Sequence, residues 1–399
     1  MITRHISLSL CLSILVLFSL SGCSALKIGP SPQNTYESAT LALTNGTLID
    51  GTGADPLADA VVLLGGDKIL AAGAADSLKV PEGVTTVDLG GATILPGFIN
   101  AHVHRGFDKS NLQAWAEGGV TTVRDEGTMP AQIATLKAFQ AEVGADPHYA
   151  RLVSAGVMLA VPGGYGDLFI ASPEEARQAV MTEIDQGVNA VKVALEDGYA
   201  GTHGLPKLTP EELKAIVTTA HEHGLPVSGH ITQGAYIQSL VDAGVDDVAH
   251  LAYDYIAPDT LQQMVKQDVY FIPTFTVFRN YGAPIGMIQN NLRQFIDLGG
   301  KAALGNDYGG GPGAFELGIP MYEVQMMSQS GMTPMQVILA GTKNAAHVLR
   351  LDAEIGSIEP GKFADIIIVD GNPLDDLQTL ANVKMVIHNG AIIRDEIRE

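Results

Sequence analysis

The stretch FINAHVHRG, residues 98–106, places His102 and His104 two positions apart, directly after the Pro-Gly pair of residues 96 and 97. Side chains two residues apart on a β-strand point to the same face, so both imidazoles would leave such a strand on one side. Two interpretations follow. The histidines are either a hydrogen-bonded pair in the wall of a barrel, or half of a metal site whose other ligands lie far along the chain.

Outward from this stretch, short apolar segments rich in β-branched residues alternate with helical segments of about a dozen residues, a pattern typical of parallel βα units. Eight strands in roughly 250 residues predict an α/β fold of the (β/α)8 TIM-barrel type. The expected strands are residues 98–104, 120–125, 151–157, 189–195, 226–230, 247–251, 269–276 and 302–307.

Helix-start signals lie between the expected strands. In TPEELKAIVTTAHEHG, residues 209–224, Thr209 is the expected N-cap and Glu212 completes a capping box behind a proline. The stretch SPEEARQAVMTEIDQG repeats this plan from Ser172 to Gly187. Both segments therefore predict helices between strands of the barrel.

The two ends of the chain show a different pattern of short strands and turns. AVVLLGGDKILAAG, residues 60–73, and ADIIIVDGNP, residues 364–373, are examples. We expect one small β-sandwich domain formed from both chain termini, residues 41–95 and 355–399, with the barrel spanning residues 96–354.

The composition limits the classes of partner. The chain has 399 residues, of which 46% are hydrophobic and 17% charged, so it can bury a large core. Its formal net charge is −21, whereas binding to nucleic acid or to an anionic membrane surface needs clustered Lys and Arg. We therefore expect a small-molecule partner and no nucleic acid; oligomer formation stays open.

The first residues have the pattern of a targeting segment. Residues 1–22 read as a signal peptide with a basic start and an apolar middle, followed by a polar tether over residues 23–40. The ending LSGC resembles the lipobox of bacterial lipoproteins, which implies lipid attachment to Cys23. A plain secretory signal with an incidental cysteine is the alternative. The expected location is the bacterial cell envelope, with contact to the membrane only through the N-terminal lipid anchor.

Lys192 stands among apolar residues in VNAVKVALEDG, residues 188–198, so strand alternation places it in the barrel interior. A buried, unpaired ammonium is costly. A neutral amine instead reacts with carbon dioxide to form a carbamate, whose two oxygens can bridge two cations. The alternatives are a lysine that extends to the barrel rim or one that pairs with Glu196.

Three further polar residues end expected strands: His230 the fifth, His250 the sixth and Asp307 the eighth. Barrel chemistry takes place at the carboxyl ends of the strands, and neutral imidazoles with carboxylates suit zinc. The metal interpretation of the histidine pair is therefore preferred. The expected ligands of two divalent ions, with zinc as the metal, are His102, His104, Lys192 as its carbamate, His230, His250 and Asp307.

The chain also resembles the amidohydrolase superfamily, in the branch of imidazolonepropionase-like proteins and metal-dependent Xaa-Pro dipeptidases. The resemblance spans about residues 41–394 and rests on LPGFINAHVH, GGVTTVRDEG, GVNAVKV, AGVDDVAHL, LGNDYG, TPMQVILAGTKNAAHVL and GSIEPGKFADIIIVDGNPLDD. It implies that His102, His104 and Asp307 hold one metal and His230 and His250 the other, with carbamylated Lys192 between them. Lys192 favours the binuclear, dipeptidase-like branch.

Two departures from the family pattern concern the substrate side. PGGYG, residues 162–166, has Tyr165 where many relatives have a histidine associated with substrate binding. ITQG, residues 231–234, lacks the His, Arg or Tyr that commonly follows the histidine of the fifth strand. We expect Tyr165 to donate a hydrogen bond to the substrate; a partly exposed loop aromatic is the alternative.

These residues lead to an expected reaction. A hydroxide that bridges the two metals attacks a carbonyl carbon, and Asp307 passes the proton to the leaving nitrogen. The expected function is hydrolysis of an amide C–N bond in a small substrate such as an Xaa-Pro dipeptide or an N-acyl amino acid. The alternatives are a lactone, ester or phosphotriester hydrolase at the same site, and a lipoprotein that binds a ligand without catalysis.

Overall fold

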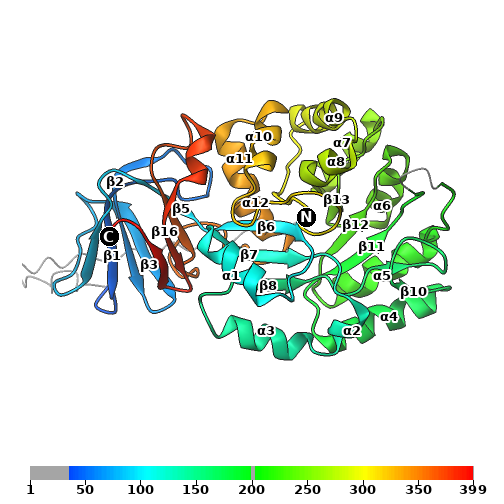
Figure 1. The fold of residues 1–399 in the computed structure, drawn as a ribbon, viewed down its shortest axis with the longest axis horizontal. Helices are drawn as coiled ribbons and strands as arrows, with labels where there is room; N and C mark the ends of the chain where they lie inside the picture. The colour runs from blue at the N-terminus through cyan, green and yellow to red at the C-terminus, as the bar shows by residue number, and fades with distance from the viewer. Residues whose placement is uncertain (1–35, 199–202, 399) are drawn as a thin grey trace, which may run out of the picture. The chain divides into compact units, whose positions relative to one another are not determined.

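The computed structural model describes residues 36–198 and 203–398, which belong to one compact unit (Figure 1). The expected signal peptide, the tether up to residue 35 and the expected lipidation site Cys23 lie outside the described residues. Tyr36 and Ala39, at the end of the expected tether, pack against the first strands. In the part of the chain that is described, none of the helices has the length and apolar character needed to cross a membrane.

The central ring is built from parallel strands in the order in which they occur along the chain. Its regular strands are β6 (Phe98–Val103), β7 (Val120–Asp125), β8 (Arg151–Ser154), β11 (Val191–Ala194), β12 (Val227–His230), β13 (Asp247–Ala249) and β14 (Tyr270–Ile272), and two short strands, β9 (Leu159–Ala160) and β10 (Leu168–Phe169), extend it beside β11. Between β8 and β11, the amides of Asn189 and Ala190 donate to the carbonyl of Ser154.

The eighth member of the ring, residues 302–308, is not a regular strand. It closes the ring through two isolated parallel bridges, Phe271 to Ala302 and Val103 to Tyr308. The amide of Ala101 also donates to the carbonyl of Leu304 at 2.8 Å. The predicted (β/α)8 TIM-barrel fold is therefore confirmed, but the strand predicted over residues 302–307 is only a bridged segment.

The seventh predicted strand, residues 269–276, was too long. β14 ends at Ile272, and helix α8 (Phe275–Tyr281) begins inside the predicted strand. The carboxylate of Glu323 accepts the backbone N–H groups of Phe275, at 2.8 Å, and of Thr276, at 2.5 Å. These bonds pair amides that have no partner within the helix, because they lie in its first turn. The carboxylate of Glu323 thereby stabilises a helix in a stretch whose apolar, β-branched residues favour a strand.

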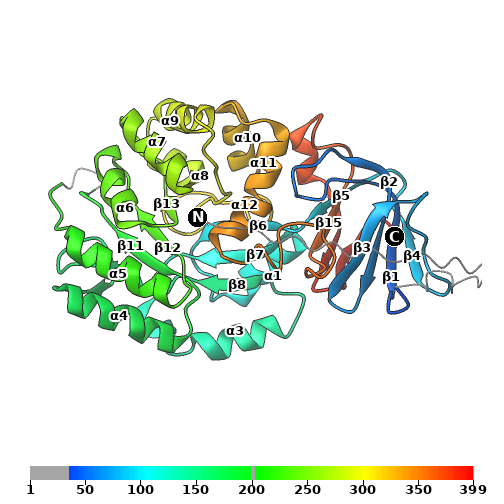
Figure 2. The same ribbon diagram turned by 180° about the vertical axis from the view of Figure 1, so that it is seen from behind.

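Helices surround the ring in both views (Figures 1 and 2). They are α1 (Lys109–Glu117), α2 (Pro130–Ile133), α3 (Leu136–Gly144), α4 (Pro173–Gln186), α5 (Pro210–Glu222), α6 (Ile237–Ala243), α7 (Pro258–Gln267), α8, α9 (Ile285–Asp297), α10 (Met321–Gln329), α11 (Pro334–Ala340) and α12 (Lys343–Val348). Thr209 and Glu212 form the predicted capping box of α5, and Ser172 caps α4. α4 ends at Gly187, whose positive φ of 96° suits glycine.

The buried carboxyl group of Glu183 on α4 makes the free energy of unfolding depend on pH. Burial raises its pKa to about 8, although it accepts the Val157 amide. Between the ordinary pKa of 4.5 and about 8, folded Glu183 keeps a proton that the unfolded chain loses, so stability falls as the pH rises through this window. We expect Glu183→Gln to raise the free energy of unfolding at pH 8 by about 1–3 kcal/mol and to change it little at pH 4.5.

Urea unfolding at the two pH values measures this effect. Asp185→Asn, at an exposed position on the same helix, is the matched control. An equal change at both pH values would show that the effect of Glu183 is not one of protonation.

Strands from both ends of the chain, blue and red in Figures 1 and 2, share a second sheet. Its order is β17-β16-β15-β5-β1-β2-β3, with β4 paired to β1. The strands are β1 (Leu41–Leu48), β2 (Leu57–Gly65), β3 (Lys68–Ala74), β4 (Thr85–Asp88), β5 (Thr93–Pro96), β15 (Ile366–Val369), β16 (Val383–His388) and β17 (Ala391–Asp395).

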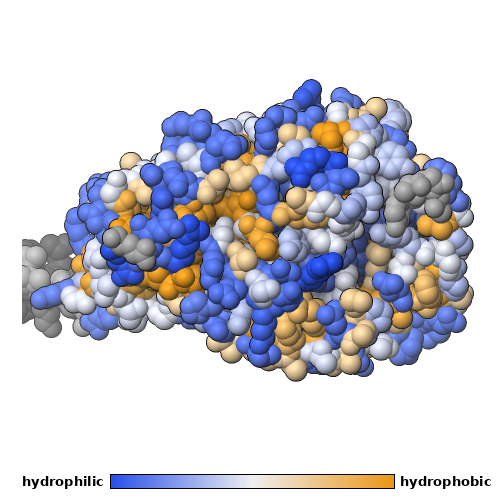
Figure 3. All heavy atoms as spheres, in the orientation of Figure 1, coloured by the Kyte–Doolittle hydropathy of each residue, from blue (hydrophilic) through white to orange (hydrophobic). Residues whose placement is uncertain are grey.

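Alternation along β15 divides its side chains between two cores. Ile366 and Ile368 pack into the core of this second sheet, whereas Ile367 and Val369 belong to the core of the barrel. An ion pair of 2.7 Å between Arg151 of β8 and Asp365 adds a polar contact. Hydrophobic residues are also visible on the surface over this sheet in Figure 3, drawn in the orientation of Figure 1.

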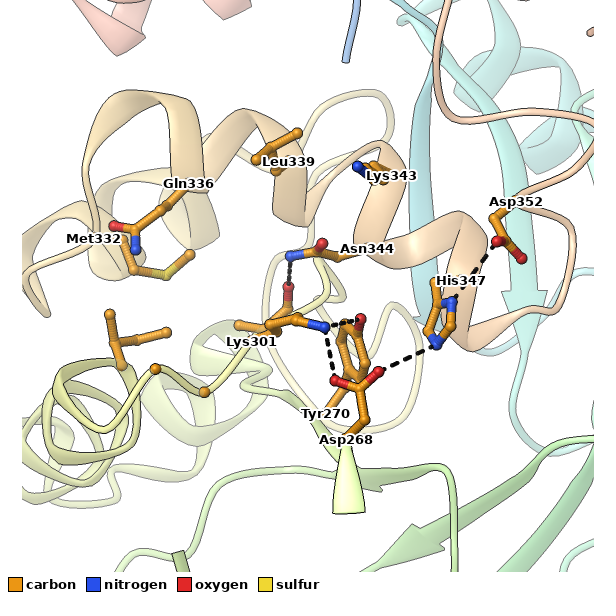
Figure 4. A pocket seen from close by; sticks show the side chains of 14 residues that line it. Asp268, Tyr270, Lys301, Met332, Gln336, Leu339, Lys343, Asn344, His347 and Asp352 are labelled. Atoms are coloured by element: carbon orange, nitrogen blue, oxygen red, sulfur yellow. Dashed lines mark hydrogen bonds and ion pairs between the residues drawn. The ribbon is translucent and has the colours of Figure 1, made fainter. Parts of the chain in front are cut away.

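A cavity of about 420 Å³ lies at the amino end of β14, opposite the barrel mouth (Figure 4). Lys301 Nζ lies 2.7 Å from Asp268 Oδ1 and 3.2 Å from the Tyr270 hydroxyl. His347 lies between Asp268, at 3.7 Å, and Asp352, at 3.8 Å. These charged groups partner one another, and catalytic sites of TIM barrels lie at the other end of the strands.

Candidate metal centre

The histidine pair converges on one carboxylate. His102 Nε2 lies 3.3 Å and His104 Nε2 3.1 Å from the same atom, Oδ1 of Asp307. Asp307, His102 and His250 also offer ligand atoms that all lie within 4.8 Å of one another. Side chains more than 140 residues apart in the chain therefore meet at one point, as the metal interpretation requires.

Each of these residues stands at the carboxyl end of a barrel strand. His102 lies in β6, His230 is the last residue of β12, and His250 directly follows β13. Asp307 has a φ of 55°, and a Cβ on Gly310 would lie only 2.1 Å from its Oδ1. Gly310 therefore leaves the room that this carboxylate occupies.

The other two imidazoles complete the cluster. The ring of His250 lies 4.8 Å from that of His102 and 4.6 Å from that of His230, measured between centroids. The Thr274 hydroxyl donates to the Pro273 carbonyl, and it lies 2.7 Å from His250 Nδ1. The hydroxyl therefore accepts from Nδ1–H, which leaves the lone pair on Nε2 of His250 for a metal.

Burial sets the charges of the cluster. Burial, with the nearby charge of Lys192, lowers the pKa of His102 to about 4, and burial also holds the pKa of His250 well below its ordinary value. Burial alone would raise the pKa of Asp307, but the charge and hydrogen bond of His102 outweigh it and hold this pKa well below its usual range. At neutral pH His102 and His250 are therefore neutral and Asp307 is ionised. Burial alone would lower the pKa of His104, but its hydrogen bond to Asp307 and the charge of Asp307 outweigh burial and raise it.

These residues fit a divalent metal. Among the described residues, the buried atoms without a hydrogen-bond partner of standard geometry include His102 Nδ1, His230 Nε2 and Asp307 Oδ1. The last two have only the ion-pair contacts of 3.1–3.3 Å to charged neighbours. Buried polar atoms are costly unless they are paired, and these atoms are nitrogen and carboxylate donors of the kind that zinc binds.

Lys192 lies inside this cluster. It is 2% exposed, and its charge affects the pKa of His102, His104, His230 and His250. It neither reaches the rim nor pairs with Glu196, the two alternatives drawn from the sequence. Its Nζ instead lies 2.5 Å from Oε2 of Glu126, and Glu196 lies 3.3 Å from His230 Nε2.

Glu126 belongs to a buried charged layer that the sequence analysis missed. Its carboxylate also contacts Arg124, whose guanidinium donates two bonds to Asp247 at 2.9 and 3.0 Å. Arg124, Glu126 and Asp247 have side chains with no exposed surface. The signal was present in the sequence, because Arg124 and Asp247 lie in otherwise apolar predicted strands and buried charges need partners.

Tyr165 lies at the mouth, as expected. Its ring stacks on His230 with centroids 4.6 Å apart and an angle of 25° between the planes. It lines two cavities, one next to His230 and His250 and one next to His104. The sequence analysis missed Val277 and Phe278, which also line the first cavity, because it assigned the start of α8 to a strand.

The barrel and this cluster define a class, that of TIM-barrel proteins with a candidate divalent-metal site at the barrel mouth. The sequence model of the amidohydrolase family matches residues 93–393, so the chain belongs to the amidohydrolase family. Members of this family typically use divalent metals. The protein is therefore an enzyme, a hydrolase acting on C–N bonds.

Named relatives are similar over most of the chain. An ochratoxinase from Aspergillus niger is 27% identical over 89% of this chain and 86% of its own length. An enamidase from Eubacterium barkeri is 27% identical over 84% and 87%, and an imidazolonepropionase from Brevibacillus brevis 29% over 60% and 55%. A solved Xaa-Pro dipeptidase with bound methionine has the same fold, with a TM-score of 0.79, 24% identity and coverage of 89% and 99%.

Proposed function

We propose that this protein hydrolyses the amide bond of a small molecule at a centre of two divalent metal ions, with zinc as the metal. The observation that carries the proposal is the convergence of His102, His104, His230, His250 and Asp307 around the buried Lys192. Within this class, the proposed substrates are Xaa-Pro dipeptides and N-acyl amino acids.

In this proposal His102, His104 and Asp307 hold one ion, and His230 and His250 hold the other. Bound divalent ions supply an acidified water and a positive charge for the carbonyl oxygen. Lys192, as its carbamate, is the shared ligand between the two sets. Its central position among the four histidines supports this role.

Asp307 is the proposed acid and base. It is the one carboxylate among the described residues that line the cavity next to His230 and His250, and it is ionised, as a group that accepts a proton must be. A carboxylate oxygen of Asp307 takes the proton of the attacking water and delivers it to the leaving nitrogen.

A substrate screen tests the reaction. The zinc-loaded protein is incubated with Xaa-Pro dipeptides, N-acyl amino acids, lactams and lactones, and release of the free amine or acid is measured. Turnover of amide substrates is the expected result. Cleavage of lactones without cleavage of any amide would overturn the proposal.

Metal content tests the role of Lys192. Lys192→Ala removes the shared ligand, so we expect the bound metal to fall from roughly two ions to roughly one per chain. Inductively coupled plasma mass spectrometry of the purified variant measures this. Lys301→Ala, at the opposite end of the barrel, is the control and should keep the full content. Unchanged metal in Lys192→Ala would contradict a two-metal site that depends on this lysine.

We also propose that the chain is exported to the bacterial cell envelope and anchored through lipid on Cys23, on the evidence of residues 1–23. Acyl chains on one cysteine hold a protein firmly at a membrane, so Cys23→Ala is expected to move it from the membrane fraction to the supernatant. A variant that stays in the membrane fraction would contradict the anchor.

For residues 41–95 and 355–399 we propose a small β-sandwich domain. The sheet formed from both ends of the chain supports this proposal.

A further inference from the structure

We propose that the substrate carries an aromatic or similarly flat apolar group, which binds in the cavity beside His230 and His250. This inference rests on the proposed function and narrows its substrate class. Among N-acyl amino acids and Xaa-Pro dipeptides, it selects those with an aromatic side group and disfavours small aliphatic ones.

The cavity adjoins the metal cluster directly. It measures about 330 Å³, and His230, His250 and Asp307 form part of its wall. Most of the remaining wall is apolar or aromatic, formed by Tyr165, Tyr253, Val277, Phe278, Tyr281 and Pro284. A group bound here would therefore lie against aromatic side chains while the amide lies at the cluster.

Two of these rings lie against the candidate metal ligands. The Phe278 ring is 6.0 Å from the His250 ring at an angle of 79°, and Tyr165 stacks on His230. Aromatic pairs favour offset-stacked and edge-to-face contacts at such spacings. A flat ring attached close to the scissile amide would thus meet one aromatic surface from its face and another from its edge.

Apart from the metal ion proposed for His230 and His250, the described lining of the cavity offers no cation to a carboxylate. None of its described lining residues is Lys or Arg, and His203, which is among them, faces Asp197 at 3.9 Å. Arg279 lies on α8 next to Phe278, but its guanidinium stacks 4.2 Å from the Tyr322 ring centroid and donates to the Ala314 carbonyl. Burying an unpaired carboxylate is costly, so an uncharged group fits this side of the cluster.

A second, larger cavity of about 840 Å³ lies on the other side of the cluster, next to His104. Charged and amide side chains contribute to its wall, among them Arg105, Lys109, Gln132 and Asp167. The two cavities share the lining residues Tyr165 and Gly310, so they adjoin each other, and in this proposal one bound molecule extends into both. The aromatic group then lies beside His230 and His250, and the polar end of the substrate lies beside His104.

The aromatic wall is held in place by the start of α8. Val277, Phe278 and Tyr281 are spaced along one side of this helix, and the carboxylate of Glu323 accepts the first two of its amides. The wall therefore does not depend on a substrate to order it.

The first experiment compares N-benzoylglycine with N-acetylglycine as substrates of the zinc-loaded full-length protein. We expect kcat/KM to be at least about tenfold higher for the benzoyl compound, since burying one apolar group typically discriminates by this much. Phe278→Ala should lower kcat/KM for N-benzoylglycine about tenfold more than it lowers kcat/KM for N-acetylglycine. Tyr255→Ala is the matched control, because Tyr255 is an exposed aromatic that lines neither cavity.

The second experiment measures binding without turnover. Benzyl alcohol and propanol are titrated into wild type, Phe278→Ala and Tyr255→Ala, and binding is followed by saturation-transfer NMR. We expect benzyl alcohol to bind more tightly than propanol, with weaker binding only in Phe278→Ala. If this pattern holds but no amide is cleaved, the proposed function fails and the aromatic site stands. Equal binding of the two alcohols, or amide cleavage with no preference for the benzoyl group, would overturn the inference.

Discussion

Asp307→Asn is expected to lower kcat for amide substrates by about 10³-fold or more while the protein stays folded. Asparagine has nearly the same shape, so the contacts of this buried position persist. It is neutral, however, and an amide oxygen neither accepts the proton of the attacking water nor offers His102 and His104 a negative partner. The effect should fall on kcat, because the aromatic and polar cavities that bind the substrate are unchanged.

Steady-state kinetics and metal analysis of the same sample separate the two roles of Asp307. A variant that keeps its metal and loses kcat shows the proton-transfer role, and one that loses a metal ion shows the ligand role as well. Asp297→Asn, at an exposed position on α9, is the control and should retain full activity. Turnover of Asp307→Asn within a few-fold of wild type would refute both roles.

Arg124→Leu is expected to lower the free energy of unfolding by about 3–5 kcal/mol, because it leaves buried partners of an ion pair without compensation. Arg124 holds Asp247 with two hydrogen bonds and contacts Glu126, and the side chains of all three are completely buried. The substitution leaves the carboxylates of Asp247 and Glu126 in the barrel interior without the guanidinium that both contact.

Urea unfolding of the variant and of Arg293→Leu, an exposed arginine on α9, measures the effect. The double variant Arg124→Leu with Asp247→Val removes one of the two carboxylates left without the guanidinium. It should recover part of the lost free energy of unfolding, because an apolar side chain can be buried without a partner. If Arg124→Leu fails to fold, the double variant still tests the argument. A single variant as stable as wild type, or a double variant less stable than the single, would contradict it.

Local patterns predicted the ring of strands and the position of four histidines at its rim. His102, His104, His230 and His250 each stand at the end of an apolar, β-branched run, and in a parallel barrel all such ends meet at one rim. Their convergence therefore follows from periodicity and chain order. The capping box at Thr209 and the cap at Ser172 were predictable for a similar reason, because the signal lies within four residues.

The features that were missed depend on partners far along the chain. Residues 275 and 276 read as strand, but Glu323, about fifty positions later, accepts their amides and starts a helix. Lys192 was predicted to be a carbamate, with a place at the barrel rim or a pair with nearby Glu196 as alternatives, whereas folding brings Glu126 to 2.5 Å from its Nζ. No local pattern indicates which of two carboxylates a buried cation meets.

The sequence by itself determined the barrel and the chemical types of the side chains at its mouth. The periods of strands and helices are properties of neighbouring residues, and so is a histidine or an aspartate at the end of an apolar run. Burial of the apolar side chains makes the fold follow these periods. Only the tertiary structure decided the layer of Arg124, Glu126, Lys192 and Asp247, and the aromatic wall on α8. The physical reason is that a buried charge or backbone amide takes whichever partner the closed barrel brings within hydrogen-bonding distance, and that partner is distant in the chain.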